Sequence, residues 1–159
     1  MYFKDYLEKY KDKKINIFID MDGVVADYDV ISYNNHKNEA NVYLDKRPIK
    51  TSINILEEVS KMNNVTLNIL SVSRNDNQIE GKKKWLKMNM SFINEERINI
   101  IPRESNGFKS SHVLKKEFLE KNISKDSINI VIDDSHLVLD TICDLNIGII
   151  PLHITSILD

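Results

Sequence analysis

The pattern of apolar and polar residues alternates between two periods along this chain. Strand-like runs, with alternating or continuous apolar residues, occur at residues 15–20, 65–71, 97–101, 128–132 and 147–152. Apolar residues recur at helical spacing over residues 2–11, 50–62, 78–89, 110–121 and 135–145. Near-continuous apolar strands that alternate with helices are typical of a parallel sheet covered on both faces. We therefore predict a three-layer α/β/α, Rossmann-like fold with a central, mainly parallel sheet.

Composition supports one globular domain and excludes several other classes. The chain has 159 residues, 42% of them hydrophobic and 29% charged, which is enough for one domain with a core. The net charge of −2 gives no indication of a nucleic-acid or membrane surface. Cys143 is the sole cysteine, which excludes an internal disulfide and favours a reducing cytoplasm. No apolar run reaches the roughly 18 residues of a membrane span, and the amino terminus lacks a signal-peptide core.

Polar residues follow three of the predicted strands. They are Asp20 and Asp22, the segment 71–74, and the pair Asp133 and Asp134. Ligands of open α/β sheets bind beyond the carboxyl ends of the strands, so we expect these residues to converge. Four carboxylates in one crevice repel one another unless a cation neutralises them. Oxygen ligands favour Mg²⁺, which binds one or two carboxylates together with substrate phosphates.

Hydrolysis of a phosphate ester would use all of these acidic residues in one reaction. A carboxylate nucleophile can form an aspartyl-phosphate that water then hydrolyses. A second acid two residues along can protonate the leaving oxygen and later deprotonate the attacking water. A hydroxyl or amide donor and a lysine would neutralise the oxygens of the transferred phosphoryl group.

The motifs DMDGVVAD, ILS and VIDDS, with a lysine between the last two, resemble the haloacid-dehalogenase-like (HAD) phosphohydrolase superfamily. The resemblance extends from about residue 14 to residue 151. It implies that Asp20 is the nucleophile and that Asp22 is the general acid/base, with its backbone carbonyl also on the metal. Asp133 and Asp134 would complete the Mg²⁺ site, and which of them binds the ion directly is left open.

The resemblance also assigns the phosphate-binding groups. Ser71 corresponds to the hydroxyl at the end of the second core strand, with Ser73 as its alternative. Gly23, Ser73 and Arg74 would contact the substrate.

The catalytic lysine has several candidates. The family places it just before, or at the start of, the helix that precedes the second acidic strand. Lys109 fits that position best. Lys115, Lys116 and Arg103 are the alternatives, although a solvated helix or loop face would also explain them.

The substrate depends on the cap over the crevice. We predict a single domain over residues 1–159, with a short cap-like insertion around 27–47 that leaves the crevice open unless an oligomeric partner covers it. The wording DMDGVVADYD is similar to the 5′(3′)-deoxyribonucleotidase branch, whose members have a larger cap. Tyr28, Tyr33 and Tyr43 in this insertion could stack on a base or simply cover the core, and His36 could touch substrate.

The resulting hypothesis is a Mg²⁺-dependent phosphomonoester hydrolase acting on a nucleotide or another small phosphorylated metabolite. A polynucleotide-end or protein phosphatase is the alternative enzyme, and a non-catalytic phosphate-binding module is the alternative of another class. Lys82, Lys83 and Lys84, next to Trp85, could contact a nucleic-acid backbone. A solvated helix face with Trp85 and Leu86 buried explains the same run better.

Overall fold

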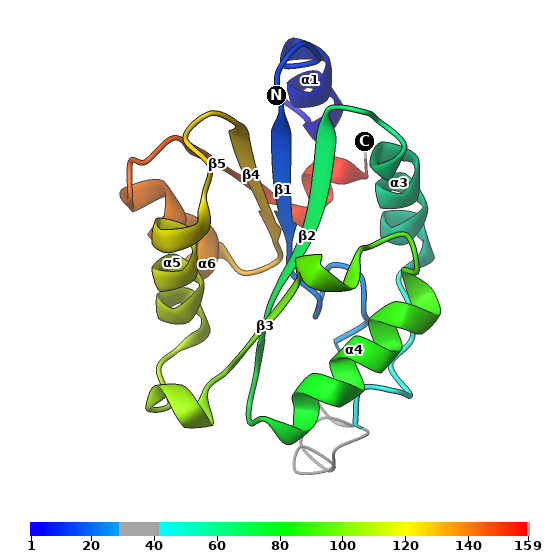
Figure 1. Ribbon diagram of the computed structural model, residues 1–159, viewed down its shortest axis with the longest axis vertical. Coiled ribbons are helices and arrows are strands. Elements are labelled where there is room, and N and C mark those ends of the chain that lie inside the picture. Colours follow the sequence, from blue (N-terminus) through cyan, green and yellow to red (C-terminus); the bar gives the residue numbers. More distant parts are fainter. Residues whose placement is uncertain (29–41, 159) are drawn as a thin grey trace.

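The computed structural model describes residues 1–28 and 42–158, and a parallel sheet lies at the centre of this part of the chain (Figure 1). The strand order is β3-β2-β1-β4-β5, and every neighbouring pair is parallel. The strands are β1 (Ile15–Ile19), β2 (Val65–Ser73), β3 (Ile98–Pro102), β4 (Ile128–Asp133) and β5 (Ile149–His153). The predicted α/β class with a parallel central sheet is confirmed.

Helices cover both faces of the sheet, as the three-layer prediction requires (Figure 1). One face carries α3 (Lys50–Ser60) and α4 (Asn77–Asn89), with α1 (Phe3–Lys9) joining the same core at one end of the sheet, and the other face carries α5 (Ser111–Asn122) and α6 (His136–Asp144) (Figure 1). The alternation of β1 explains the two cores, because successive strand side chains point to opposite faces. Ile15, Ile17 and Ile19 pack with the first group of helices, whereas Phe18 packs with the second.

The register of the sheet aligns the ends of its three central strands. Ile19 of β1 pairs with Ile69 of β2 on one side and with Ile132 of β4 on the other. The chain then leaves the sheet at Asp20, whose backbone N–H still donates to the carbonyl of Ile132 (2.9 Å). The polar residues that follow β1 and β4 are therefore side by side.

Element boundaries differ from the predicted ones where strand pairing extends an element. β2 continues to Ser73, two residues beyond the predicted end, because Ser71, Val72 and Ser73 pair with β3. Short 3₁₀ helices lie between and after the main elements: η1 (Glu95–Arg97), η2 (Glu104–Asn106) and η3 (Ile154–Ile157). The extension of β2 places Ser73 inside a strand and not in a loop.

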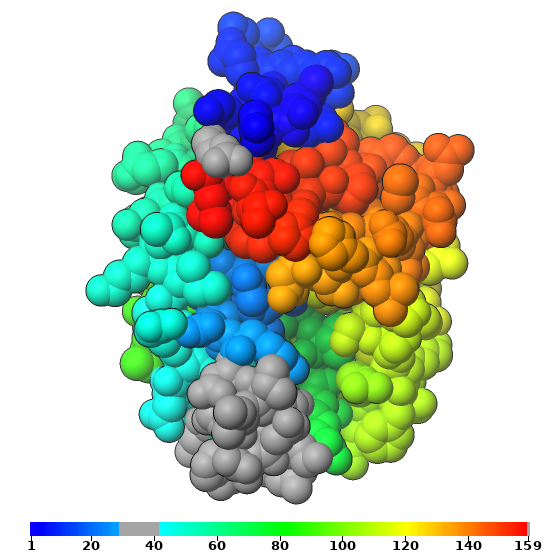
Figure 2. Space-filling model, turned by 180° about the vertical axis from the view of Figure 1, so that it is seen from behind, coloured from blue at the N-terminus to red at the C-terminus, as the bar shows by residue number. Residues whose placement is uncertain are grey.

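The two ends of the chain meet on one side of the molecule. Helix α1 packs against η3, and Figure 2 shows the amino-terminal residues in blue directly against the carboxy-terminal residues in red. Figure 1 places both at the end of the sheet opposite the carboxyl ends of the strands. Within the described ranges, none of the helices is both long and apolar enough to cross a membrane.

Candidate active site

Three carboxylates meet beyond the ends of β1 and β4. Asp20 follows β1, Asp133 is the last residue of β4, and Asp134 comes next. One carboxylate oxygen from each lies within 4.8 Å of the others. Carboxylate oxygens at this spacing are the ligands that hard divalent cations prefer. The strand ends predicted to converge do so, and they form a potential cation site.

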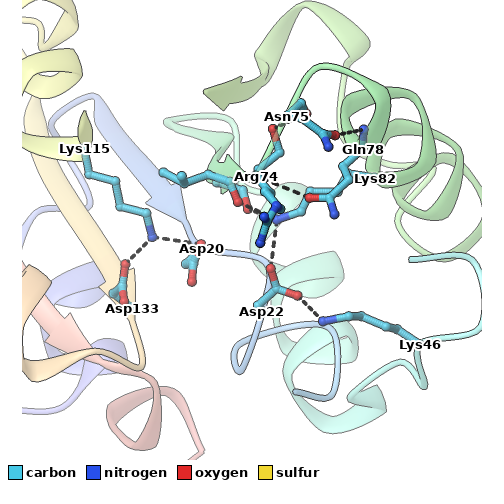
Figure 3. Close-up of polar contacts among 12 residues, drawn as sticks. Asp20, Asp22, Lys46, Arg74, Asn75, Gln78, Lys82, Lys115 and Asp133 are labelled. Carbon is cyan, nitrogen blue, oxygen red and sulfur yellow. Dashed lines mark hydrogen bonds and ion pairs between the residues drawn. The ribbon is translucent and has the colours of Figure 1, made fainter. Parts of the chain in front are cut away.

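Lys115 connects two of these acids (Figure 3). Its ammonium nitrogen lies 2.8 Å from Oδ1 of Asp20 and 2.6 Å from Oδ2 of Asp133. Burial by itself would lower the pKa of Lys115, but the negative charges of Asp20 and Asp133 outweigh burial and raise it above the usual value. Lys115 therefore stays charged beside the predicted nucleophile.

The same cluster raises the pKa values of Asp20 and Asp134, whereas an ordinary salt bridge lowers the pKa of a carboxyl group. Burial raises the pKa of Asp20 to about 6; Lys115 opposes this, and the charges of Asp133 and Asp22 add to it. The pKa of Asp134 is also raised, first by burial and then by the charge of Asp20. Burial is the main cause of both shifts, and neighbouring negative charge adds to each of them; a bound cation would relieve that repulsion.

Lys109 does not lie with these acids, and this corrects its placement in the sequence analysis. Its ammonium group pairs with Oε1 of Glu117 at 2.6 Å, and its side chain is 47% exposed. Lys109 precedes helix α5, whereas Lys115 lies inside it between the buried residues Leu114 and Leu119. The helix therefore turns Lys115 toward the sheet and leaves Lys109 at the surface. The alternative Arg103 donates to the backbone carbonyls of Lys109 and Phe108.

Asp22 has the opposite surroundings (Figure 3). Its Oδ1 binds the ammonium of Lys46 at 2.5 Å, and its Oδ2 binds that of Lys82 at 2.8 Å. Burial raises the pKa of Asp22, but the charges of Lys82 and Lys46 prevail and lower it below the usual value. The side chain of Asp22 stands outside the acidic group of Asp20, Asp133 and Asp134. Its two oxygens are occupied by lysines instead.

Gly23 allows the turn after Asp22 to approach Asp134 closely. Its φ of +79° lies in the left-handed region, and its N–H donates to the carbonyl of Ala26 (2.8 Å). A Cβ atom at this position would stand 2.1 Å from Oδ2 of Asp134. Glycine is therefore required for two reasons, its backbone conformation and the space taken by Asp134.

The two candidate serines on β2 have different surroundings. Ser71 is fully buried, and its hydroxyl oxygen accepts a hydrogen bond from Lys82 at 2.8 Å. Ser73 lines a cavity of about 410 Å³ together with Arg74, and its hydroxyl donates to the carbonyl of Asn75 (3.0 Å). Ser73 is also buried, but unlike Ser71 it lines the cavity.

The cavity brings together most of the predicted site residues. Asp20, Asp22, Asp133 and Asp134 line it with Lys115, and further cationic and aromatic groups contribute: Arg74, Arg103, Tyr28 and Tyr43. Tyr43 is buried under Lys46 and Lys82, whose ammonium groups lie 4.8 and 4.5 Å from its ring centre. Tyr33 and His36 fall outside the described residues.

Lys46 and Lys82 are the residues that the sequence analysis missed at this site. Lys82 was expected on a solvated helix face, but it is fully buried, while Trp85 and Leu86 are buried as expected. A pattern could have revealed it, because the buried positions of α4 are Gln78, Gly81, Lys82, Trp85 and Leu86. A lysine inside the apolar stripe of a helix faces the interior. Lys46 lies near the end of the insertion predicted around residues 27–47 and carries no comparable pattern.

A family model of the polynucleotide kinase PNKP phosphatase domain, of the HAD class, matches residues 14–152. The chain belongs to this family. It is therefore a HAD-type phosphatase, as its motifs predicted. No curated protein matches the sequence.

Solved structures agree with the fold of this HAD-type phosphatase. A chain of the Pnkp1/Rnl/Hen1 complex is similar with a TM-score of 0.67 and 14% identity, over 89% of this chain and 46% of that one. A second structure, of the Pnkp1/Rnl/Hen1 RNA repair complex, is similar with a TM-score of 0.65 and 15% identity, over 89% of this chain and 43% of that one. The HAD domain of the Legionella pneumophila effector Lem4, as an inactive mutant, is similar with a TM-score of 0.50 and 17% identity, over 89% of this chain and 85% of that one. This phosphatase thus spans less than half of the first two chains.

Proposed function

We propose that this phosphatase removes a terminal phosphate monoester from a polynucleotide, with Asp20 as nucleophile and Mg²⁺ as cofactor. The observation that carries the proposal is the position of Asp20, which lines the cavity, belongs to the acidic cluster and pairs with Lys115. The family match supports a polynucleotide end as substrate. Arg74 and Arg103 line the same cavity and could neutralise backbone phosphates next to the reacting one.

The donor set fits Mg²⁺. Asp20, Asp133 and Asp134 oppose one ammonium group, that of Lys115, which leaves an excess of two negative charges. These three carboxylates would hold the ion. When bound, it would neutralise negative charge on the transferred phosphoryl group.

The residues of the chain then divide the reaction into two steps. A carboxylate oxygen of Asp20 attacks phosphorus, the bond from phosphorus to the leaving oxygen breaks, and Asp22 gives that oxygen a proton. Water next attacks the aspartyl-phosphate, Asp22 takes its proton, and phosphate leaves as Asp20 is restored. Because its two lysines keep Asp22 ionised in the free protein, the first proton must arrive with the substrate or from solvent.

A substrate panel tests the proposal. It contains oligonucleotides with a 3′- or a 5′-phosphate, deoxynucleoside monophosphates and p-nitrophenyl phosphate, each assayed with Mg²⁺ and with a chelator. We expect metal-dependent release of phosphate and the highest kcat/KM on an oligonucleotide end. Asp20→Asn should lower it by at least about 10³-fold. Asp144→Asn, an exposed acid on α6, is the matched control and should keep full activity.

Salt separates the two substrate classes. Binding of an oligonucleotide should weaken steeply as salt rises, because each neutralised phosphate releases counterions. A flat response together with higher kcat/KM on deoxynucleoside monophosphates would instead establish the small-nucleotide specificity expected from the sequence. Absence of metal-dependent turnover on every substrate would reject the enzymatic proposal itself.

A further inference from the structure

Lys82 is the centre of a buried hydrogen-bond cluster beside the predicted acid/base, Asp22. Its ammonium nitrogen lies 2.8 Å from Oδ2 of Asp22, 2.8 Å from the hydroxyl oxygen of Ser71 and 2.9 Å from the carbonyl oxygen of Val72. An ammonium group has three N–H donors, so these acceptors satisfy all of them. The side chain of Lys82 is 0% exposed, whereas that of Asp22 is 18% exposed and lines the cavity.

Stability alone does not explain why a lysine is buried at this position. Taking an ammonium group out of water costs free energy, and a buried ion pair is weak evidence for stabilisation. An apolar residue of the same volume would fit the stripe formed by Gly81, Trp85 and Leu86. A buried lysine at this position instead gives Asp22 a partner in a fixed place.

Helix α4 controls both sides of Asp22. Lys82 holds Oδ2 directly, and Trp85, one turn later, donates its indole N–H to the backbone carbonyl of Lys46 (2.8 Å). Lys46 in turn binds Oδ1. The strand β2 fixes the ammonium of Lys82 from the other side through Ser71 and Val72. The orientation of the Asp22 carboxylate is therefore set by a helix and a strand.

We propose that Lys82 is a positioning residue that holds Asp22 toward the leaving oxygen, with Ser71 holding the Lys82 ammonium in place. The proposal rests on the proposed function, since it assumes that Asp22 transfers the proton. Lys82 does not line the cavity, so it acts through Asp22 and not on the substrate. This also gives the buried Ser71 a role different from binding phosphate.

The consequence is a dependence on the leaving group. Proton transfer to the leaving oxygen matters greatly when that oxygen is basic and little when it departs readily as an anion. A loss of Asp22 positioning should therefore slow phenyl phosphate far more than p-nitrophenyl phosphate. A general loss of structure, or of charge around the phosphoryl group, should slow the two esters equally.

The experiment measures kcat/KM for both esters in the parent, Lys82→Met and Ser71→Ala, with saturating Mg²⁺. For Lys82→Met we expect the ratio of phenyl to p-nitrophenyl phosphate to fall on the order of 10-fold or more. Ser71→Ala keeps the lysine and removes one of its anchors, so the ratio should fall in the same direction by a smaller factor. Lys84→Met, an exposed lysine two residues away on α4, is the matched control and should leave the ratio at the parental value.

The outcomes separate the two proposals. If the parent hydrolyses neither these esters nor any member of the substrate panel above, the proposed function fails, and this inference fails with it. If the parent is active and both variants slow the two esters equally, or not at all, the positioning role of Lys82 is rejected alone. If Lys82→Met does not fold, as judged by circular dichroism and urea unfolding, the ratio in Ser71→Ala decides.

Discussion

The two acids that follow β1 lie two residues apart and have opposite surroundings. On the side of Asp20, and among the residues that the structure describes, three carboxylates surround the ammonium of Lys115. On the side of Asp22, one carboxylate opposes two ammonium groups, those of Lys46 and Lys82. The strand alternation turns Asp20 toward α5, and the turn that follows brings Asp22 to α4. One side therefore carries excess negative charge and the other excess positive charge.

This difference shows how one short motif can supply two kinds of carboxylate. Burial and neighbouring carboxylates raise the pKa of Asp20 to about 6, although Lys115 opposes the shift. At Asp22, burial acts in the same direction, but two lysines outweigh it and lower the pKa. The first side suits a cation, and the second suits the negative charge of a phosphate ester. Separate environments for paired carboxylates are a recurrent way to give them separate roles.

The strongest test of the comparison removes the positive charge of Lys115 from the acidic side. Lys115→Met should lower kcat/KM by about 10²–10³-fold, because a charge aimed at the nucleophile and phosphoryl group is lost. Lys109→Met is the matched control on the preceding loop, and it should stay within about twofold. The measurement is phosphate release at saturating Mg²⁺, with urea unfolding as a check on folding. Equal activity in the two folded variants would contradict the placement of the catalytic lysine on α5.

A smaller effect should appear where the two sides meet, at Gly23. Gly23→Ala and Gly107→Ala both force alanine into a left-handed backbone conformation, with φ of +79° and +70°. Each should lower the free energy of unfolding by about 1–2 kcal/mol. Only at position 23 would the new methyl group meet Asp134; at position 107 nothing lies within 4 Å.

Metal activation distinguishes these two variants. Gly23→Ala should raise the Mg²⁺ concentration for half-maximal activity, because the Asp134 carboxylate must turn away from the cluster. Gly107→Ala should leave that concentration unchanged. The same Mg²⁺ dependence in both variants would show that Asp134 contributes no ligand.

The last expected effect is a pH-dependent gain in stability from Asp20→Asn in the presence of a chelator. The folded chain holds the Asp20 proton up to about pH 6, whereas the unfolded chain releases it near 3.8. The parent therefore loses this contribution to its stability as pH rises from about 4 to about 6, and the variant lacks the contribution.

At neutral pH, Asp20→Asn should therefore be more stable by up to about 3 kcal/mol, and the gain should vanish below about pH 4. Urea unfolding at both pH values measures it. A gain of the same size at both would disprove the link to Asp20 ionisation.

The fold was largely predictable because its signal is local and repeated. Each strand and helix has its own apolar period, and the parallel sheet follows from their alternation. The ends of elements were less predictable: β2 runs on to Ser73 because β3 pairs with it, and β3 is distant in sequence. The convergence of Asp20, Asp133 and Asp134 was predictable from the rule that ligands bind at the carboxyl ends of strands.

The lysines were not predictable in the same way. Lys109 was preferred for its position before a helix, whereas the structure brings Lys115 to the acids because the buried stripe of α5 includes it. Lys82 was assigned to a charged surface run, although its neighbours Trp85 and Leu86 define a buried face that also contains it. In both α4 and α5, the helix face on which a lysine lies decides whether it reaches the acids, and its neighbours along the chain do not.

The sequence by itself determined the parallel α/β fold, the motif with Asp20 and Asp22, and the second acidic strand end. These depend on local periodicity and on the order of elements, which any reader of the chain can follow. Only the tertiary structure decided which cations face which acid. A long lysine side chain reaches across elements, and the helix face that carries it is set by packing between distant segments. The contrast between Asp20 and Asp22 is therefore a property of the folded chain.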